Sequence, residues 1–552
     1  MSGRRLSLSA PTENGEILLK PDAEKIKNDL QNNREQLANF PVRIGESTLS
    51  DWRRRTRGEI ITLARDYCRK LHLPEVDCNL DELMVVTGHQ CQFFHCGILA
   101  KYYFVEALMQ KEQGVALNLI VDSDLTKNIE LLLPVQLPEG WVVKSLALDR
   151  YDSQLPLEVQ RPPGYREGQG FIKELKNLSA GYITGERLAE IERVWREAAE
   201  LSENLADFFT LLNRKLRGSG SVDWGEIPVS TLAGSEGFLA FTQDMLKRSV
   251  QVRQCYNEAL ASYRNLYNKR PGRGPMPELR GSEKQEQWQE SPFWVVGQPN
   301  QKKQEQPRRR PLFVRHEQDT LFFGDGNVEL GSLGQESLFD VVRFADYLRE
   351  RQLGLRPRAL TLSVFARLFL GDIFIHGIGG AHYDQVSDEF IKRYYGMAPP
   401  GFVCVTATKY LPLGERVRPD EARDQLRRCH QRQRDLQFNP QRFLEIDDAK
   451  KSTQADLIVQ REQAIEESKE LRRNRGSKKK RIEVFERIRG LNAELASQAD
   501  EAKKQLQQNT NEAERYYRSS KTASYREYFF GLYPRQDLEC LKRKLQGYFE
   551  LD

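Results

Sequence analysis

The chain has 552 residues, which is too long for one compact core, so its 39% hydrophobic residues are expected to form two or three units. Charged residues make up 30% of the chain, above the roughly 25% typical of globular domains. This excess predicts a long solvated helical region beside the packed core. The 84 basic and 79 acidic residues leave a net charge of only +5, which gives no case for a nucleic acid or a membrane as partner.

The cysteine content and hydropathy bear on the cellular compartment of the protein. Eight cysteines form no CxxC pair, and neither a secretory signal nor an apolar run of membrane-spanning length is visible. These features favour a cytoplasmic protein with reduced thiols. Residues 1–20 begin with a polar stretch and are predicted to be a flexible N-terminus. From residue 20 to residue 70, apolar residues recur at three- and four-residue steps, which predicts helices that pack on the core.

Residues 84–133 alternate between an apolar strand, a helix and a second strand. This is the pattern of a parallel sheet with a right-handed crossover. In the loop after the first strand, Thr87 and Gly88 are candidates to bind a carboxylate or phosphate, because glycine lets a ligand approach the backbone. Gln90 and His95 add side-chain donors where the first helical N–H groups point.

His89 is a candidate for proton transfer near neutral pH, and a buried histidine bonded to a backbone carbonyl is the structural alternative. Asp122 and Asp124 follow the second strand, at the end where open α/β sheets place their ligand crevice. The two carboxylates are predicted to bind an ammonium group or a magnesium ion. Helix capping is the alternative, since Asp is favoured at such positions.

Residues 161–170 are expected to break the pattern, and residues 171–215 to resume as helix. Residues 218–310 are predicted to be an irregular connecting insertion, because their Gly, Pro and like-charge runs disfavour packed structure. The basic run 308–310 is a candidate phosphate contact, with a solvated loop as the alternative. Short apolar runs at 292–296, 311–314 and 320–323 predict strands.

Residues 373–384, IFIHGIGGAHYD, predict a strand, a glycine-rich turn and a helix. Gly377, Gly379 and Gly380 alone are a weak phosphate signal, which the position between strand and helix strengthens. Because parallel strands share one carboxyl edge, this turn and the loop at residues 87–90 are expected to converge in one crevice. The spacing of His376, His382 and Asp384 matches no established zinc pattern, so no metal is expected.

Residues 419–520 contain few aromatic residues and many Glu, Lys, Arg and Gln, which indicates long helices. Apolar residues recur there at the three- and four-residue steps of a coiled-coil seam: Ile482, Phe485, Ile488, Leu491, Leu495, Ala499, Ala502 and Leu506. Residues 451–473 and 481–508 are therefore predicted to run antiparallel, with the tip at residues 474–480.

The segment at residues 84–103, MVVTGHQCQFFHCGILAKYY, resembles the strand–TGQQ–helix signature of the bacillithiol synthases, the cysteine-adding ligases of bacillithiol biosynthesis. Later segments follow the family's order along nearly the whole chain. LNLIVDSD at residues 117–124 is similar to its second core strand with an acidic pair. In the glycine-rich turn, Gly377, Gly379 and Tyr383 stand at matching positions, and YREYFFGLYP at residues 525–534 is similar to the C-terminal return segment.

The chain also departs from the family at six positions. Glutamine is replaced by His89, glutamate by Val121, histidine by Ser123, arginine by Thr361, glutamine by Phe365 and glutamate by Gly380.

The resemblance implies a Rossmann-like parallel α/β core at residues 21–217 and 311–418, an antiparallel coiled-coil arm at residues 419–520, and a return segment at residues 521–552 that packs on the core. It also implies a homodimer joined through the arm. The implied activity joins the carboxyl of cysteine to the amine of glucosaminyl malate, an amino-sugar conjugate. This condensation needs carboxyl activation, for which a nucleotide, ATP or ADP, is the candidate.

In that reaction the loops at residues 87–90 and 377–380 would hold a substrate carboxylate or phosphate. Asp122 and Asp124 would bind the amine, and His89 would assist proton transfer. Two alternatives remain open. One is a noncatalytic coiled-coil assembly protein that retains a degenerate pocket, and the other is a ligase that acts on a different amine.

Overall fold

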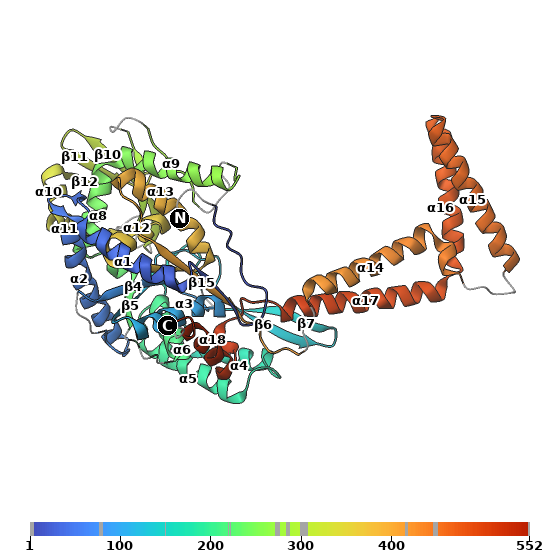
Figure 1. The fold of residues 1–552 in the computed structure, drawn as a ribbon, viewed down its shortest axis with the longest axis horizontal. Coiled ribbons are helices and arrows are strands. Elements are labelled where there is room, and N and C mark those ends of the chain that lie inside the picture. The colour runs from blue at the N-terminus through green and yellow to red at the C-terminus, as the bar shows by residue number, and fades with distance from the viewer. Residues whose placement is uncertain are drawn as a thin grey trace. The chain divides into compact units, whose positions relative to one another are not determined.

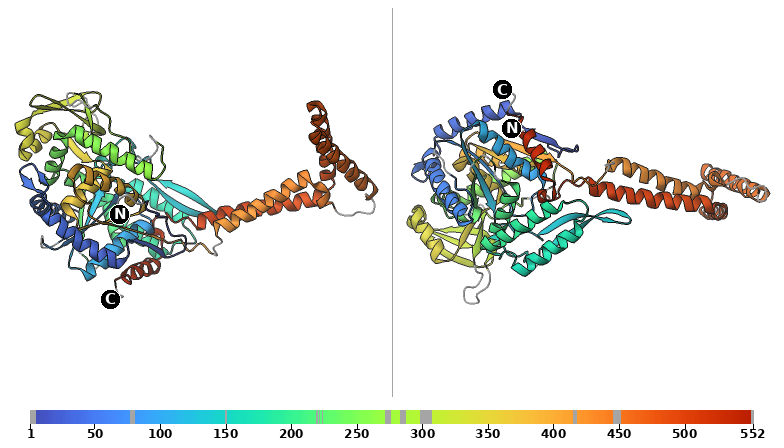
Figure 2. Two further views of the ribbon diagram at one scale, coloured as in Figure 1. Left: turned by 45° about the horizontal axis from the view of Figure 1, so that its top comes forward. Right: turned by 90° about the horizontal axis from the view of Figure 1, so that it is seen from below.

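The computed structural model describes residues 5–76, 81–148, 151–218, 220, 222, 224–270, 276–282, 287–297, 307–414, 418–444 and 451–549, which Figure 1 and Figure 2 show from three sides. The chain divides into two compact units. The first, called the core unit, comprises residues 1–133, 145–411 and 526–552. The second, called the helical unit, comprises residues 134–144 and 412–525. The C-terminal segment thus belongs to the core unit.

A six-stranded sheet runs through the core unit in the order β1-β15-β14-β4-β5-β8. Its strands are β1 (Glu16–Lys20), β4 (Leu83–Gln90), β5 (Gly114–Val121), β8 (Trp224–Pro228), β14 (Ile373–His376) and β15 (Phe402–Thr408). The last five are parallel, whereas β1 is antiparallel to β15 at the edge. Strands buried on both faces need continuous apolar runs, which β4 and β5 supply. The α/β class is thereby confirmed, but the sheet is mixed and not purely parallel.

The N-terminal strand shows that the prediction of a flexible start over residues 1–20 is wrong for residues 16–20. These residues pair with β15, from Glu16 opposite Thr408 to Lys20 opposite Cys404. Upstream, the Thr408 hydroxyl donates a hydrogen bond to the Pro11 carbonyl over 2.6 Å. Backbone hydrogen bonds to an existing sheet edge therefore order a segment that looks featureless in sequence.

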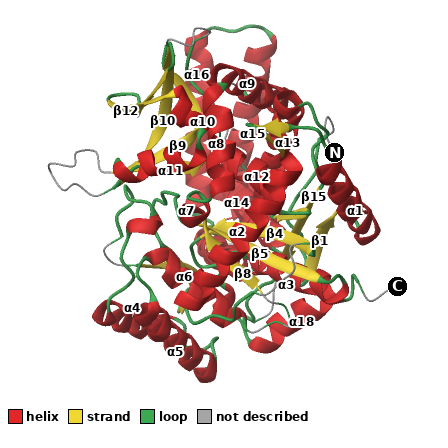
Figure 3. Cartoon of the chain, turned by 90° about the vertical axis from the view of Figure 1, so that its left-hand side faces the viewer, coloured by secondary structure: helices red, strands yellow, loops and turns green. Residues whose placement is uncertain are grey.

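Helices flank the strands of the core unit, as Figure 3 shows. As the sequence predicts, α3 leads from β4 to β5 and α13 follows β14. The strand to which α13 leads, β15, is an addition that the structure shows. The predicted interruption at residues 161–170 ends earlier than expected, because α4 begins at Tyr165. Gly164 is its N-cap residue and donates its N–H to the Glu167 carboxylate over 2.8 Å. The helices are α1 (Ala23–Asn39), α2 (Leu49–Lys70), α3 (Cys96–Lys111), α4 (Tyr165–Leu178), α5 (Gly185–Leu201), α6 (Leu205–Arg217), α7 (Val229–Leu232), α8 (Glu236–Lys247), α9 (Ser249–Leu266), α10 (Gln335–Phe339), α11 (Val341–Glu350), α12 (Ala359–Phe365), α13 (Ile378–Tyr395) and α18 (Arg535–Gln546).

The prediction of an irregular insertion at residues 218–310 is wrong for most of that stretch. Its described residues include β8, α7, α8, α9 and β9 (Gln289–Gly297). In α9, buried apolar residues recur with a helical period: Val252, Tyr256, Ala259, Leu260 and Tyr263. The Gly/Pro and charged runs that suggested irregularity fall largely on residues 271–275 and 298–306, which lie outside the described residues.

A second, antiparallel sheet of the core unit has the order β12-β11-β10-β9-β13. Besides β9 it comprises β10 (Arg308–Glu317), β11 (Thr320–Gly324), β12 (Glu329–Gly334) and β13 (Gly354–Pro357). The three strands predicted from the apolar runs at 292–296, 311–314 and 320–323 are present in β9, β10 and β11. The solvated loop considered for residues 308–310 is wrong, because these arginines form the start of β10.

The helical unit consists of paired helices and the hairpin residues 134–144. Its helices are α14 (Pro419–Phe438), α15 (Lys451–Arg473), α16 (Lys478–Ser497) and α17 (Asp500–Ala523). Figure 2 shows α14 beside α17 and α15 beside α16, which are also the pairs in contact. The helix predicted over residues 481–508 is not continuous, because the chain leaves α16 at Gln498 and enters α17 after Ala499.

The predicted apolar seam is divided between the two helix pairs. Leu491 and Leu495 pack with Leu457 and Ala464, whereas Ala499 and Leu506 pack with Leu436. The chain therefore changes helix partners where α16 ends. Two of the predicted seam residues lie outside both clusters, since Ile482 is 48% exposed and Phe485 is 57% exposed.

None of the helices in the described ranges combines the length and the apolar content that crossing a membrane requires.

Candidate functional site

A cavity of about 610 Å³ lies in the core unit where β4, β5 and β14 end. The loop that follows β4 and the glycine-rich turn that follows β14 both line it. Their convergence follows from the parallel order of the strands, which brings the carboxyl ends to one edge of the sheet. The single crevice predicted from the sequence is therefore confirmed.

Most of the sequence-predicted site residues line this cavity: Gly88, His89, Gln90, His95, Asp124, Gly377, Gly379, Gly380 and Tyr383. Thr87 and Asp122 do not. The Thr87 hydroxyl is buried and donates to the Ile375 carbonyl over 2.9 Å, so this side chain ties β4 to β14. The predicted ligand contact of Thr87 is thus wrong as far as its side chain is concerned.

Asp122 lies beneath the first turn of α7 and outside the cavity. Its carboxylate accepts hydrogen bonds from the Ser230 N–H, at 3.0 Å, and from the Ser230 hydroxyl. Burial raises the pKa of Asp122 to about 7, an effect that the nearby Glu158 increases. Asp122 thus binds the start of α7 from a distant segment without being its N-cap residue, which is Pro228. This geometry does not support the prediction that Asp122 binds a substrate amine.

The two histidines at the cavity make local hydrogen bonds. His89 Nδ1 lies 3.1 Å from the Gln90 carbonyl, which is the backbone-bonded alternative, and His95 Nδ1 accepts from the Gly97 N–H over 3.0 Å at the start of α3. Burial, reinforced by nearby positive charge, lowers the pKa of each imidazole to about 3. Both are therefore neutral at pH 7, and His89 is too weak a base for its predicted role in proton transfer.

Lys101 is the functional candidate that sequence reasoning missed. It lines the cavity, is only 2% exposed, and donates from Nζ to the Gly88 carbonyl over 2.8 Å. Within the described part of the chain, no carboxylate forms an ion pair with it, and burial lowers the pKa of its ammonium to about 7. The signal in the sequence is α3 itself, which is apolar on every face along most of its length and must therefore bury the lysine in its middle.

Arg526 adds a second cation from the C-terminal segment. Its Nη2 donates to the Thr406 hydroxyl and to the Ala407 carbonyl, each at 2.9 Å. Its Nε is buried and has no hydrogen-bond partner among the described residues. Arg526 lines the cavity, so the return segment contributes a positive charge to the site.

Asp124 is the carboxylate of the predicted pair that does face the cavity. It forms an ion pair with Arg309 of β10 at 2.7 Å and accepts from Gln90 Nε2 at 3.2 Å. Arg309 in turn lies over the Trp294 ring, 4.5 Å from its centre. The basic run of residues 308–310 thus holds an acidic side chain in place, instead of forming a solvated loop.

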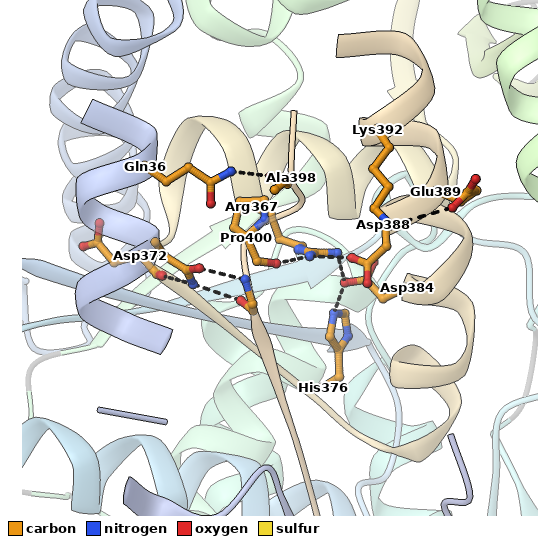
Figure 4. Close-up of polar contacts among 12 residues, drawn as sticks. Gln36, Arg367, Asp372, His376, Asp384, Asp388, Glu389, Lys392, Ala398 and Pro400 are labelled. Carbon is orange, nitrogen blue, oxygen red and sulfur yellow. Dashed lines mark hydrogen bonds and ion pairs between the residues drawn. The ribbon is translucent and has the colours of Figure 1, made fainter. Parts of the chain in front are cut away.

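His376 connects the cavity to a buried charge network, shown in Figure 4. Its Nε2 lies 2.9 Å from the Asp384 carboxylate, and Arg367 binds Asp384 and Asp388 at 2.7 Å each. Arg367 also donates to the Pro400 carbonyl. Burial alone would raise the pKa of Asp384, but Arg367 and His376 hold it well below its usual range. Every charge in this network has a counter-charge.

In the described ranges of the chain, no three His, Cys, Asp or Glu side chains are grouped to hold an ion. His382 faces the edge of the Tyr267 ring, with 5.7 Å between ring centres, while His376 and Asp384 bind each other.

The N-terminal segment also contributes to the site. Leu8, Ser9 and Ala10 line the cavity, and the Leu6 N–H donates to the Tyr267 hydroxyl over 2.9 Å.

Of the positions where the chain departs from the bacillithiol synthases, Thr361 and Phe365 are buried in α12 outside the lining. Their neighbour Ser363 faces the cavity instead.

Comparisons of the sequence with protein-family models and with curated proteins found no match. The resemblance to the bacillithiol synthases therefore remains a prediction based on the motifs given above.

Proposed function

We propose that this protein is a carbon–nitrogen ligase that joins a carboxylate to an amine, with cysteine and glucosaminyl malate as the substrates that the resemblance suggests. The observation that carries the proposal is the convergence of two glycine-containing loops and of both charge signs on one cavity. Lys101 and Arg526 supply the basic groups there, and Asp124 and Glu527 supply the carboxylates.

Each group has a chemical task in this proposal. Arg526 and the first turn of α13 attract a substrate carboxylate or phosphate, since helix N-termini and guanidinium groups both favour anions. Asp124 attracts the ammonium group of the acceptor. Lys101, with its pKa lowered to about 7, replaces His89 as the base that removes the proton of the attacking amine.

A nucleotide is compatible with the cavity. A Cβ atom built on Gly377 or Gly379 would meet nothing within 4 Å, so a phosphate group has room to approach the start of α13. When bound, the nucleotide would supply the phosphoryl group that activates the carboxyl. The residues that would hold its phosphates are the backbone N–H groups at residues 378–380 and the Arg526 guanidinium.

The test is amide formation by the full-length protein supplied with cysteine, glucosaminyl malate and ATP, followed by mass spectrometry. Asp124→Asn should lower product formation roughly tenfold, because it removes a charge-assisted contact to the amine. Asp346→Asn is the matched control, since Asp346 is likewise a carboxylate paired with an arginine but lies on α11, away from the cavity. Equal losses in both variants, or no product with any amino-sugar acceptor, would contradict the proposal.

A second candidate, an assembly protein that dimerises through its helices, is favoured by one observation. Ile482 and Phe485 lie three residues apart on α16 and are both exposed in the single chain. A second copy would cover them in a coiled coil. Replacing both by glutamate should convert a dimer to a monomer in sedimentation, whereas Val342→Glu on α11, equally exposed, should not. A wild-type monomer at micromolar concentration would exclude this candidate.

A further inference from the structure

Arg526 approaches α3 at Gly97, one helical turn before Lys101, and both residues line the cavity. A Cβ atom built on Gly97 would stand 2.5 Å from the Arg526 Nη2 and 2.6 Å from the Thr406 hydroxyl. Lys101 follows Gly97 by four residues, and side chains at that spacing are neighbours on a helix, about 5–6 Å apart. The absence of a side chain at residue 97 therefore leaves room for a guanidinium one helical turn from the position of the lysine.

The two groups are suited to different parts of one small molecule. Arg526 retains a buried Nε–H without a partner among the described residues, which suits a carboxylate. Lys101 is enclosed, lacks a counter-ion in the described chain, and bonds only to a neutral carbonyl, which favours its uncharged form. An uncharged amine in an enclosed cavity is a nucleophile toward carbonyl carbon.

We propose that the cavity binds an α-oxo acid, whose carboxylate is held by Arg526 and whose carbonyl carbon condenses with the Lys101 amine to an imine. The Nζ lone pair forms the carbon–nitrogen bond while the carbonyl π electrons move to oxygen, which takes up a proton from Nζ. Loss of that hydroxyl with the second Nζ proton releases one water and leaves the carbon–nitrogen double bond. No oxidant or reductant takes part. The imine would form at the same Lys101 and Arg526 that the proposed ligase uses, but its formation does not require the ligase activity.

Burial favours the product. Imine formation replaces an amine that would be charged without a partner by a neutral group that keeps the apolar part of the side chain in place. The cavity of about 610 Å³ is large enough for a small oxo acid such as glyoxylate or pyruvate.

The experiment traps the imine in the full-length wild-type protein with glyoxylate and cyanoborohydride at pH 7, and peptide mapping locates the reduced adduct. Lys111 is the internal standard, because it lies at the exposed end of the same helix. Lys101 should be labelled about tenfold faster than Lys111, since far more of it is uncharged at that pH. Labelling of Lys101 at or below the rate of Lys111 would overturn the proposal, and this comparison requires no variant.

The role of the carboxylate is tested by replacing glyoxylate with acetaldehyde, which has the carbonyl alone. Arg526→Gln should slow labelling of Lys101 by glyoxylate roughly tenfold and leave labelling by acetaldehyde unchanged. Arg535→Gln, a partly exposed arginine of the same C-terminal segment, should alter neither. If Arg526→Gln slows both aldehydes equally, or slows neither, the assignment of an oxo acid is wrong.

Discussion

Two groups of buried charges meet at the cavity, and they are balanced in opposite ways. Around Arg367, two carboxylates and a carbonyl surround the guanidinium, and Asp384 keeps a pKa below its usual range. Around Lys101, the neighbouring titratable groups are His89, His95 and Cys404, none of which is an anion at neutral pH. Burial there lowers the pKa of the lysine to about 7.

The difference separates groups that hold the fold from groups that are free to react. A buried ion pair whose charges balance has no reason to exchange protons, and breaking it leaves an uncompensated charge. A buried lysine without a counter-ion is costly to the fold and is kept near its point of titration, which is where catalytic amines function. Three substitutions test this comparison.

The largest effect is expected for Arg367→Met, which would leave Asp384 and Asp388 buried side by side without their cation. The free energy of unfolding should fall by about 3–5 kcal/mol, as measured by urea denaturation at pH 7. Arg393→Met is the control, because Arg393 pairs with two glutamates at the surface and should cost no more than about 1 kcal/mol. Equal costs would mean that the Arg367 network contributes no more than a surface ion pair.

A smaller effect of opposite sign is expected for Lys101→Met. The pKa of Lys101 is about 7 in the folded protein and 10.5 in the unfolded reference, so the unfolded state binds more protons between these values. Wild-type stability should therefore rise with pH from about 7 to 10, because losing the lysine proton on folding costs progressively less as the pH approaches the unfolded-state pKa. Methionine, which has no charge, should stabilise the protein by about 2 kcal/mol at pH 6 after the loss of the bond to Gly88.

This gain should shrink as the pH rises and disappear above the unfolded-state pKa of 10.5, where lysine is mostly neutral in both states. Lys111→Met at the exposed end of α3 should change stability by less than about 0.5 kcal/mol at every pH. A destabilised Lys101→Met at pH 6 would show that an anion balances the lysine after all.

The contrast also explains which parts of the fold the sequence could predict. The strands β4, β5 and β14 are apolar runs bounded by glycine or acidic residues, and their parallel order alone brings two distant loops together. The edge strand β1 could not be predicted in the same way, because it forms a strand only through its pairing with β15. The helix α9 was predictable from its apolar residues at helical spacing. The glycine, proline and charged runs that follow it favour irregular structure, and they led to the wrong prediction for the whole segment.

For the site, side-chain direction was the missing information. Thr87 and Asp122 belong to the expected segments, yet their side chains point to Ile375 and Ser230 and not into the cavity. Arg526 reaches the cavity from the C-terminal segment of the chain, and no local sequence pattern predicts that contact. Lys101 could have been found, since a largely apolar helix carries the lysine in its middle into the interior.

The smallest effect is expected for Asp122→Asn. Asp122 is a buried carboxylate that neither belongs to a balanced ion pair among the described residues nor lines the cavity. Folding raises the pKa of Asp122 to about 7 from 3.8, so the folded state binds more protons between these values and wild-type stability should fall as the pH rises through that range. Asparagine still accepts from the Ser230 N–H and does not ionise, so the variant should lack this fall and be more stable at pH 8 by about 1 kcal/mol. Binding of glyoxylate at Lys101 should be unchanged, because Asp122 does not line the cavity. Weaker binding with unchanged pH dependence of stability would place Asp122 among the reacting groups. The distinction between structural and reactive buried charges would then be wrong for this residue.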